Sequence, residues 1–242
     1  MHTESKTLPK TLERLVNILS KNSNIKPAKA KELVLEAEVE VDDLMEYETF
    51  NHPVEDCYGR VLIYEGGGFE VMAMSWRPGD YSAIHNHGYT EWGVVQVFGV
   101  AQNNLFCIKD DTFQLSKKEI LQPRDAIKVN NALIHQMGNP TTKPYVSLHV
   151  YGASTRENNI TADAKVFELE KNRVIHTTGG AFFNLPKDQI YNAVQGIHTT
   201  QETFMHHAYL LLAYYNRQEN TEELRKLKAD LLQQMSAWSM EN

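Results

Sequence analysis

The chain has 242 residues, of which 42% are hydrophobic and 23% charged, so it can bury the core of one globular domain with helical additions. Its formal net charge is −7, and interleaved acidic and basic residues argue against a nucleic-acid binder or a lipid-surface binder. No stretch approaches the length of a membrane span, and the N-terminus MHTESKTLPK has no apolar signal core. Cys57 and Cys107 form no zinc or disulfide pattern, so we expect a cytoplasmic protein that binds neither nucleic acid nor membrane.

The first fifty residues carry a helical pattern. Pro9 suits a first helical turn, and the hydrophobic residues after it recur at helical spacing: Leu12, Leu15, Val16 and Leu19. A second helix is predicted to begin at Pro27. We expect residues 1–54 to form an N-terminal helical region packed on the rest of the fold, with His52 on the surface.

From about residue 58 the pattern changes to short β-rich runs separated by glycine and proline. The clearest runs are RVLIYE, FEVMAMSW, WGVVQVFGV and YVSLHVYG. Short strands at this spacing are typical of a sandwich or barrel, and the lack of alternating helices argues against a parallel sheet. We therefore expect residues 55–184 to form a mainly β domain.

After residue 185 the chain is predicted to be helical again. Thr199 with Glu202, and Asn220 with Glu223, have the spacing of a helix-capping box. Beyond them an apolar stripe steps by three and four residues: Leu224, Leu227, Leu231, Met235 and Trp238. We expect residues 185–242 to be a C-terminal helical extension, whose stripe either packs on its own barrel or joins two copies in a homodimer.

Residues 83–93, AIHNHGYTEWG, contain two histidines that point to one face if this segment is a strand. Two imidazoles side by side are costly unless a divalent metal joins His85 and His87. His135 in NNALIHQMGNP lies where a barrel would bring it opposite this pair. The pair makes a metal site a hypothesis, while a single histidine such as His135 is more often a core or turn residue. In a regular strand Glu91 and Trp92 face opposite sides, so only one of them points at the metal.

The spacing G-x5-H-x-H-x3-E, followed by H-x3-N, resembles the two motifs of the cupin superfamily. The resemblance implies a small jelly-roll β-barrel with a metal inside, flanked here by helices. In the usual pattern six residues separate the glutamate from the closing glycine. Here seven residues separate Glu91 from Gly99, so Trp92 stands at the position of the usual glutamate when counted back from that glycine. Asn130 and Ala132 also stand where cupins usually have Pro-x-Gly.

A more specific resemblance, over residues 58–185, is to the cysteine dioxygenase family of thiol dioxygenases. Four pieces carry it: Tyr58-Gly59-Arg60, SAIHNH at 82–87, LIHQMGN at 133–139 and VSLHVYG at 146–152. The resemblance implies one Fe²⁺ per chain, held by His85, His87 and His135, and a small-molecule thiol and O₂ as reactants.

The resemblance also implies roles around the metal. Arg60 corresponds to the arginine that receives a substrate carboxylate, and Tyr58 either supports that carboxylate or packs. A relay of this form, with Ser147, His149 and Tyr151 on one strand face, orients the tyrosine hydroxyl in the family.

Animal members carry a cysteine that crosslinks to this tyrosine. Trp92 stands in its register, so we expect no thioether. We expect Trp92 to wall the substrate pocket, or a bulge to bring Gly93 into the site instead.

Three interpretations compete at this point. The favoured one is a three-histidine thiol dioxygenase that converts L-cysteine to its sulfinic acid, with 3-mercaptopropionate and mercaptosuccinate as alternative substrates. The second makes Glu91 a fourth ligand of iron, manganese or nickel, with other dioxygenase or isomerase chemistry. The third, a non-catalytic cupin, predicts loss of ligands, yet all three histidines are present.

Overall fold

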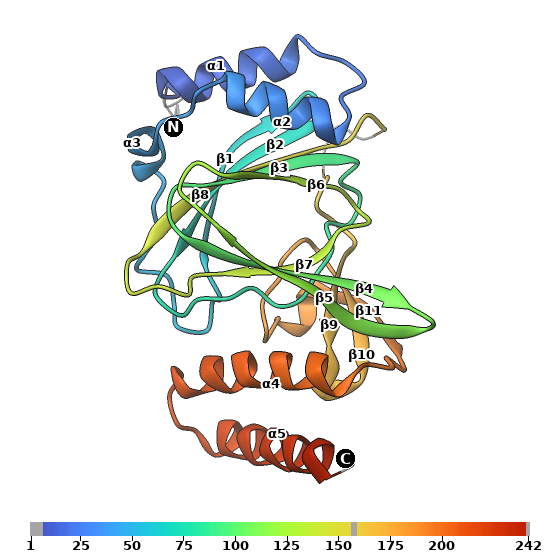
Figure 1. Cartoon of the computed structure of the whole chain (residues 1–242). Coiled ribbons are helices and arrows are strands. Elements are labelled where there is room, and N and C mark those ends of the chain that lie inside the picture. The colour runs from blue at the N-terminus through green and yellow to red at the C-terminus, as the bar shows by residue number, and fades with distance from the viewer. Residues whose placement is uncertain (1–6, 156–158, 241–242) are drawn as a thin grey trace.

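The computed structural model describes residues 7–155 and 159–240, and its strands form antiparallel sheets between two groups of helices (Figure 1). A five-stranded sheet has the order β1-β2-β8-β3-β6: Gly59–Gly66, Phe69–Trp76, Tyr145–Gly152, Trp92–Val97 and Ala126–Val129. A three-stranded sheet faces it in the order β5-β4-β7: Thr112–Leu121, Ala101–Lys109 and Ile134–Gly138. A second three-stranded sheet has the order β11-β10-β9: Ile190–Gln195, Arg173–Thr177 and Ala164–Glu168. The mainly β fold predicted from the short, glycine-punctuated runs is therefore confirmed.

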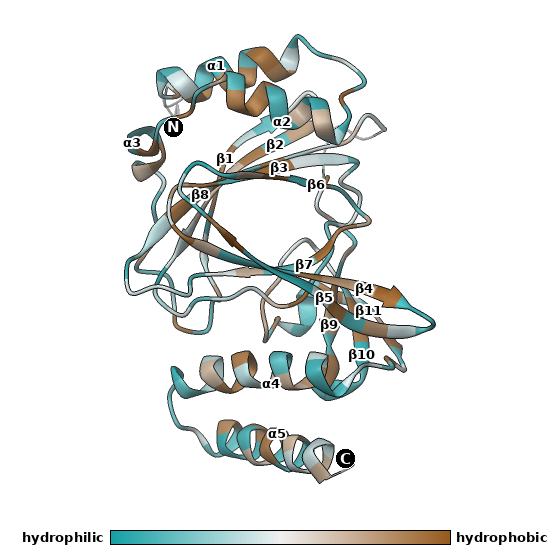
Figure 2. Cartoon of the chain, in the orientation of Figure 1, coloured by the Kyte–Doolittle hydropathy of each residue, from teal (hydrophilic) through white to brown (hydrophobic). Residues whose placement is uncertain are grey.

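Strand β8 is buried along its whole length because both faces of its sheet are covered. Val146, Leu148 and Val150 face a core under the N-terminal helices. The alternate side chains, among them Tyr151, face the interior between the sheets. Period-two alternation thus divides one strand between a hydrophobic layer and a polar interior. Figure 2 shows the hydrophobic residues concentrated along the strands and on parts of the helices.

Three N-terminal helices cover the outer face of the five-stranded sheet: α1 at Lys10–Ser20, α2 at Pro27–Glu36 and α3 at Val41–Met45 (Figure 1). The predicted stripe of α1 is buried at Leu12, Leu15 and Leu19, where it packs with the outward side chains of the sheet. These helices give the five-stranded sheet the hydrophobic cover that an all-buried strand requires.

The C-terminal region contains α4 at Gln201–Asn216 and α5 at Glu222–Met240, but also strand β11, which the sequence pattern did not predict. Both caps lie one residue later than predicted. The Thr200 hydroxyl accepts from the amide of Thr203, and that of Thr221 accepts from Leu224. The hydroxyl of Thr199, the predicted cap of α4, donates to the Phe113 carbonyl.

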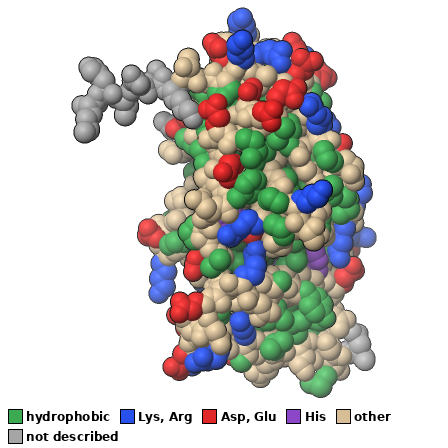
Figure 3. Space-filling model, turned by 90° about the vertical axis from the view of Figure 1, so that its left-hand side faces the viewer, with side chains coloured by type: hydrophobic (Ala, Val, Ile, Leu, Met, Phe, Trp, Pro, Cys, Tyr) green, Lys and Arg blue, Asp and Glu red, His purple; other side chains and the backbone are tan. Residues whose placement is uncertain are grey.

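The apolar stripe of α5 packs within its own chain. Leu224, Leu231 and Met235 are buried in the main core, and Trp238 stacks on Phe204 of α4 with ring centroids 5.3 Å apart. This packing accounts for the stripe without a second copy, and a homodimer stays a prediction. None of the described helices is long and apolar enough to cross a membrane. Figure 3 shows acidic and basic side chains interleaved over one face of the molecule.

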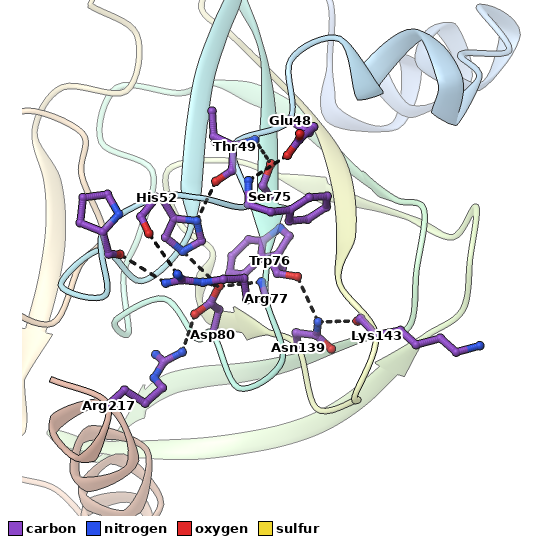
Figure 4. Close-up of polar contacts among 12 residues, drawn as sticks. Glu48, Thr49, His52, Ser75, Trp76, Arg77, Asp80, Asn139, Lys143 and Arg217 are labelled. Atoms are coloured by element: carbon purple, nitrogen blue, oxygen red, sulfur yellow. Dashed lines mark hydrogen bonds and ion pairs between the residues drawn. The ribbon is translucent and has the colours of Figure 1, made fainter.

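A buried carboxylate joins the C-terminal helices to the sheets (Figure 4). Asp80, in the turn after β2, is fully buried and lies 2.5 Å from Arg217 Nη1 at the end of α4. Its other oxygen lies 3.2 Å from His52 Nε2 and accepts from the Arg77 amide at 2.6 Å. Burial raises the pKa of the Asp80 carboxyl, but its contacts with His52 and Arg217 lower the pKa by more. The pKa of Asp80 therefore lies below its ordinary value. His52 is thus buried beside this carboxylate, and its predicted surface position is wrong.

We expect Asp80→Asn to lower the free energy of unfolding by about 3 kcal/mol at neutral pH, because it removes the buried charge that pairs with the Arg77 and Arg217 guanidinium groups. A lowered folded pKa stabilises the fold above the unfolded value of about 3.9, and this stabilisation is lost as the pH falls through the folded pKa. Urea unfolding of both proteins at pH 7 and pH 3 should therefore show a difference that shrinks in acid. As a control, Glu40→Gln removes an exposed ion pair with Arg124 and should cost less than about 1 kcal/mol. An equal loss in both variants would contradict the role of Asp80.

Candidate metal centre

Three histidines from distant parts of the sequence meet inside the fold. His85 and His87 lie in the segment after β2, and His135 lies on β7. The backbones of His85 and His135 exchange two hydrogen bonds of 2.9 Å, which places the first histidine pair beside the second motif. One ligand atom from each of the three side chains lies within 4.8 Å of the others. Among the described residues this is the one group of three or more histidine, cysteine or acidic residues that could hold a metal ion.

The hydrogen bonds of two rings leave one nitrogen of each available. His85 Nδ1 lies 2.9 Å from the carbonyl oxygen of Ala83, and His135 Nδ1 lies 2.8 Å from Oδ1 of Asn103. Because both partners can only accept there, each Nδ1 carries the hydrogen and each Nε2 presents a lone pair. The Asn103 amide in turn donates to Glu119 at 3.2 Å. This pattern is typical of histidines that ligate a metal through Nε2.

Neither ring nitrogen of His87 has a hydrogen-bond partner among the described residues, although both are buried. The carbonyl groups of Asn130 and Leu133 lie toward the ring without completing a hydrogen bond. A buried nitrogen without a partner is destabilising, and a metal ion would satisfy it. The three rings therefore fit a divalent metal.

Burial lowers the pKa of all three imidazoles, that of His85 to about 4 and those of His87 and His135 well below the usual range. The neighbouring imidazoles lower the values of His87 and His135 further. All three rings are thus neutral at pH 7, which is the form that binds a metal.

Glu91 lies outside this cluster. Its carboxylate accepts hydrogen bonds from the Ser154 amide at 3.0 Å and from the Thr155 hydroxyl at the protein surface. The structure therefore gives no support to Glu91 as a fourth ligand.

The predicted position of Trp92 in the pocket wall is wrong. Trp92 pairs with Gly152 and is buried in the core under the N-terminal helices, with its ring 6.4 Å from that of Phe69. Gly93 instead pairs with Tyr151, and a Cβ on Gly93 would lie 2.9 Å from Tyr151 Cδ1. At the start of β3, the face toward Tyr151 therefore has room only for glycine, whereas the opposite face buries the indole of Trp92. The residue beside Tyr151 therefore has no thiol, and the absence of a thioether stays a prediction.

The three predicted polar residues of β8 form a continuous relay. Ser147 Oγ lies 2.8 Å from His149 Nε2, and His149 Nδ1 lies 2.7 Å from the Tyr151 hydroxyl. Trp76, which the sequence analysis missed, extends it by donating its indole N–H to Ser147 Oγ at 2.8 Å. Sequence alone offers little signal for Trp76, because a tryptophan in a strand is usually only part of the core.

One order of donors satisfies every buried group of the relay. The indole of Trp76 can only donate, so Ser147 accepts from it, and His149 Nε2 then provides the acceptor for the buried Ser147 hydrogen. A neutral His149 then donates from Nδ1 to the Tyr151 oxygen, which leaves the Tyr151 hydrogen for the pocket. Burial and the nearby Arg60 lower the pKa of His149 to about 3, while burial raises that of Tyr151, so both stay neutral at pH 7.

A cavity of about 20 Å³ adjoins the histidines. Its lining comprises Tyr58, Arg60, Met74, His85, Asn86, His87, Tyr151, Thr161, Ala164, Gly179 and Ala181. Arg60 donates from Nε to the Met72 sulfur at 3.1 Å and from Nη1 to the Gly179 carbonyl at 3.4 Å. The Tyr58 ring packs between Trp76 and Phe182, with both centroids 4.8 Å away, and burial raises its pKa to about 12.

The structure therefore brings every predicted site residue except Trp92 to one region. It adds Thr161, Gly179 and Asn103, which the sequence analysis did not identify. A signal for Asn103 exists in AQNNLFCI, where two polar residues interrupt an apolar strand.

We expect a divalent metal to stabilise the protein against unfolding, by about 2.7 kcal/mol when the free metal is 100 times its dissociation constant. His87→Leu should abolish this effect, and the metal-free variant should be at least as stable as the metal-free parent because two buried orphan nitrogens are gone. Thermal unfolding with and without Fe²⁺ under anaerobic conditions measures both effects. His176→Leu is the matched control, since His176 bonds to Asp163 outside the cluster and should leave the metal effect intact. A metal effect that persists in His87→Leu would remove His87 from the ligand set.

Comparisons with known proteins agree with this geometry. The family described as cysteine dioxygenase type I matches residues 1–158. Cysteine dioxygenase type 1 from Danio rerio is 29% identical over 153 residues, which cover 59% of this chain and 75% of that protein. The Homo sapiens protein of the same name is 27% identical over 149 residues, covering 59% and 74%.

Among solved structures, a double-stranded beta-helix protein from Klebsiella pneumoniae aligns with a TM-score of 0.38 and 18% identity, over 47% of this chain and 82% of its own. A Cupin 2 conserved barrel domain protein from Salinispora arenicola aligns with a TM-score of 0.34 and 14% identity, over 43% and 82%. The family match, together with the facing antiparallel sheets, confirms the predicted cupin fold. The chain belongs to the cysteine dioxygenase type I family and is an oxidoreductase.

Proposed function

We propose that this protein is a non-haem iron thiol dioxygenase that converts L-cysteine to its sulfinic acid. The observation that carries the proposal is that a cluster of three neutral histidines adjoins a single small pocket, which one arginine and the tyrosine oriented by the relay also line. In the reaction R–SH + O₂ → R–SO₂H, both oxygen atoms end on sulfur and no other reductant is needed. The relatives named cysteine dioxygenase type 1 support the same chemistry.

His85, His87 and His135 would hold the iron through three neutral nitrogens. When bound, ferrous iron supplies the oxygen chemistry, and without an anionic ligand it keeps its full double charge, which favours binding of a thiolate. The pocket residues provide the rest of the site by binding the substrate, orienting it and excluding water.

Arg60 is the one cationic side chain that lines the described pocket. Its Nε and Nη1 bonds to Met72 and Gly179 fix the plane of the guanidinium and leave N–H groups for a ligand. A guanidinium in a fixed plane suits a carboxylate, which it can bind through two parallel hydrogen bonds. A single cation favours thiols with one carboxylate, such as L-cysteine or 3-mercaptopropionate, over mercaptosuccinate with two.

Tyr151 supplies a neutral donor beside the histidines. Its ring centroid lies 5.4 Å from that of His87, and the relay directs its hydrogen away from His149. The raised pKa keeps this hydrogen in place at neutral pH. We assign Tyr151 the role of donating a hydrogen bond to the bound substrate or oxygen, with Ser147 and His149 as its orienting residues.

The direct test is oxygen uptake by anaerobically iron-loaded protein given L-cysteine, with the product identified by mass. We expect one O₂ consumed per thiol and a product two oxygen atoms heavier than cysteine. Uptake with 3-mercaptopropionate but not L-cysteine would move the specificity within the same mechanism. Lack of uptake with any thiol, from protein that still binds Fe²⁺, would contradict the proposal.

Arg60→Gln should raise the KM for L-cysteine about 10- to 100-fold, because a charge-assisted pair with the carboxylate is lost. The KM for 2-aminoethanethiol, which has no carboxylate, should change less than about threefold, well under the tenfold that 1.4 kcal/mol would give. Steady-state oxygen uptake with both thiols measures the two effects. Arg124→Gln, a surface change on the exposed pair with Glu40, serves as the control and should leave both values unchanged. Equal increases for the two thiols in Arg60→Gln would rule out the carboxylate role.

A further inference from the structure

The substrate pocket is completed by residues that follow the segment matched by the family. The match ends at residue 158, yet Thr161, Ala164, Gly179 and Ala181 all line the cavity. Gly179 also supplies the carbonyl that holds Arg60. The contacts that hold this part of the wall therefore bear on which substrate the pocket accepts.

Glu70 makes the contacts that hold Thr161 in the wall. It lies on β2 directly opposite Tyr151, and only 5% of its surface is exposed. Its Oε1 accepts from the Ile160 amide at 3.1 Å, and the Thr161 hydroxyl lies toward the same carboxylate and lowers its pKa. A buried carboxylate without such donors would be strongly destabilising, so these contacts tie the segment to the sheet.

A chain of contacts leads from Thr161 to Arg60. Gly179 lies against Thr161 so closely that a Cβ there would be 2.7 Å from Thr161 Oγ1, and its φ of +114° favours glycine. The carbonyl of Gly179 then accepts from Arg60 Nη1 at 3.4 Å. Glu70 thus supports the acceptor that orients the guanidinium, without itself lining the cavity.

We propose that Glu70 is a positioning residue for substrate specificity: by holding Ile160 and Thr161 it keeps the Gly179 carbonyl where Arg60 is oriented to receive a carboxylate. This inference rests on the proposed function, because the ligand of Arg60 is taken to be the carboxylate of a small thiol. Burial raises the pKa of Glu70 and the charge of Arg60 opposes that rise, which is consistent with an electrostatic contact between the two groups.

Glu91 offers a matched control on the same connection between β8 and β9. Its carboxylate accepts from Ser154 and Thr155, so it ties this connection to the barrel as Glu70 does. Neither Ser154 nor Thr155 lines the cavity. Loss of Glu91 should therefore loosen the connection without disturbing Arg60.

The test compares Glu70→Leu, Glu70→Gln, Thr161→Val and Glu91→Leu in the iron-loaded full chain. Glu70→Leu should raise the KM for L-cysteine about tenfold while kcat changes less than about twofold, and the KM for 2-aminoethanethiol should barely change. Glu70→Gln keeps an oxygen that can accept from Ile160 and should restore most of the affinity. Thr161→Val keeps the side-chain shape without the hydroxyl and should resemble Glu70→Leu, whereas Glu91→Leu should resemble the parent.

Anaerobic calorimetry with L-cysteine provides a second readout that does not depend on turnover, and the dissociation constant should follow the KM. An unchanged KM and affinity in Thr161→Val and Glu70→Leu would overturn the inference. So would equal losses for both thiols, equal losses in Glu91→Leu, or a Glu70→Gln variant that folds but is no better than Glu70→Leu. If Glu70→Leu does not fold, Thr161→Val and Glu70→Gln decide. A parent that oxidises no thiol would refute the proposed function instead, while calorimetry would still report on Glu70.

Discussion

The burial of three neutral imidazoles beside one another is the constraint on which the site depends. With no carboxylate among them, the rings cannot be stabilised by an internal ion pair, and burial lowers the pKa of each. His85 and His135 are held in place by the double hydrogen bond between their backbones and by the Nδ1 bonds to the Ala83 carbonyl and the Asn103 side chain. The facing sheets thus hold a set of lone pairs that only a cation can satisfy together.

A second consequence of the fold is that one strand serves two layers. The outward side chains of β8 form the core under the N-terminal helices, while Ser147, His149 and Tyr151 on the same strand form the relay. The C-terminal helices support the opposite end of the molecule through the buried pair of Asp80 and Arg217.

Much of this arrangement follows from local patterns in the sequence. The alternation of β8 depends only on strand geometry, so Ser147, His149 and Tyr151 could be assigned without a structure. The segment with His85 and His87 forms only isolated bridges rather than the strand that the i, i+2 spacing suggested, although both rings still reach the cluster. The position of Trp92 could not, because the register at the start of β3 depends on where the N-terminal helices can bury an indole. The contacts of Glu70 with residues 160–161 could not be predicted either, since they join segments about ninety positions apart that carry no shared pattern.

The relay ends at the indole of Trp76, and this has a consequence for proton movement. An indole N–H donates a hydrogen bond but neither accepts one nor gives up its proton near neutral pH. The chain of hydrogen bonds behind Tyr151 therefore ends at Trp76, and no proton can enter it from the solvent through the indole. It acts as a permanent dipole aimed at the pocket, so the orientation of the tyrosine hydroxyl is insulated from the pH of the surroundings over the range in which His149 stays neutral.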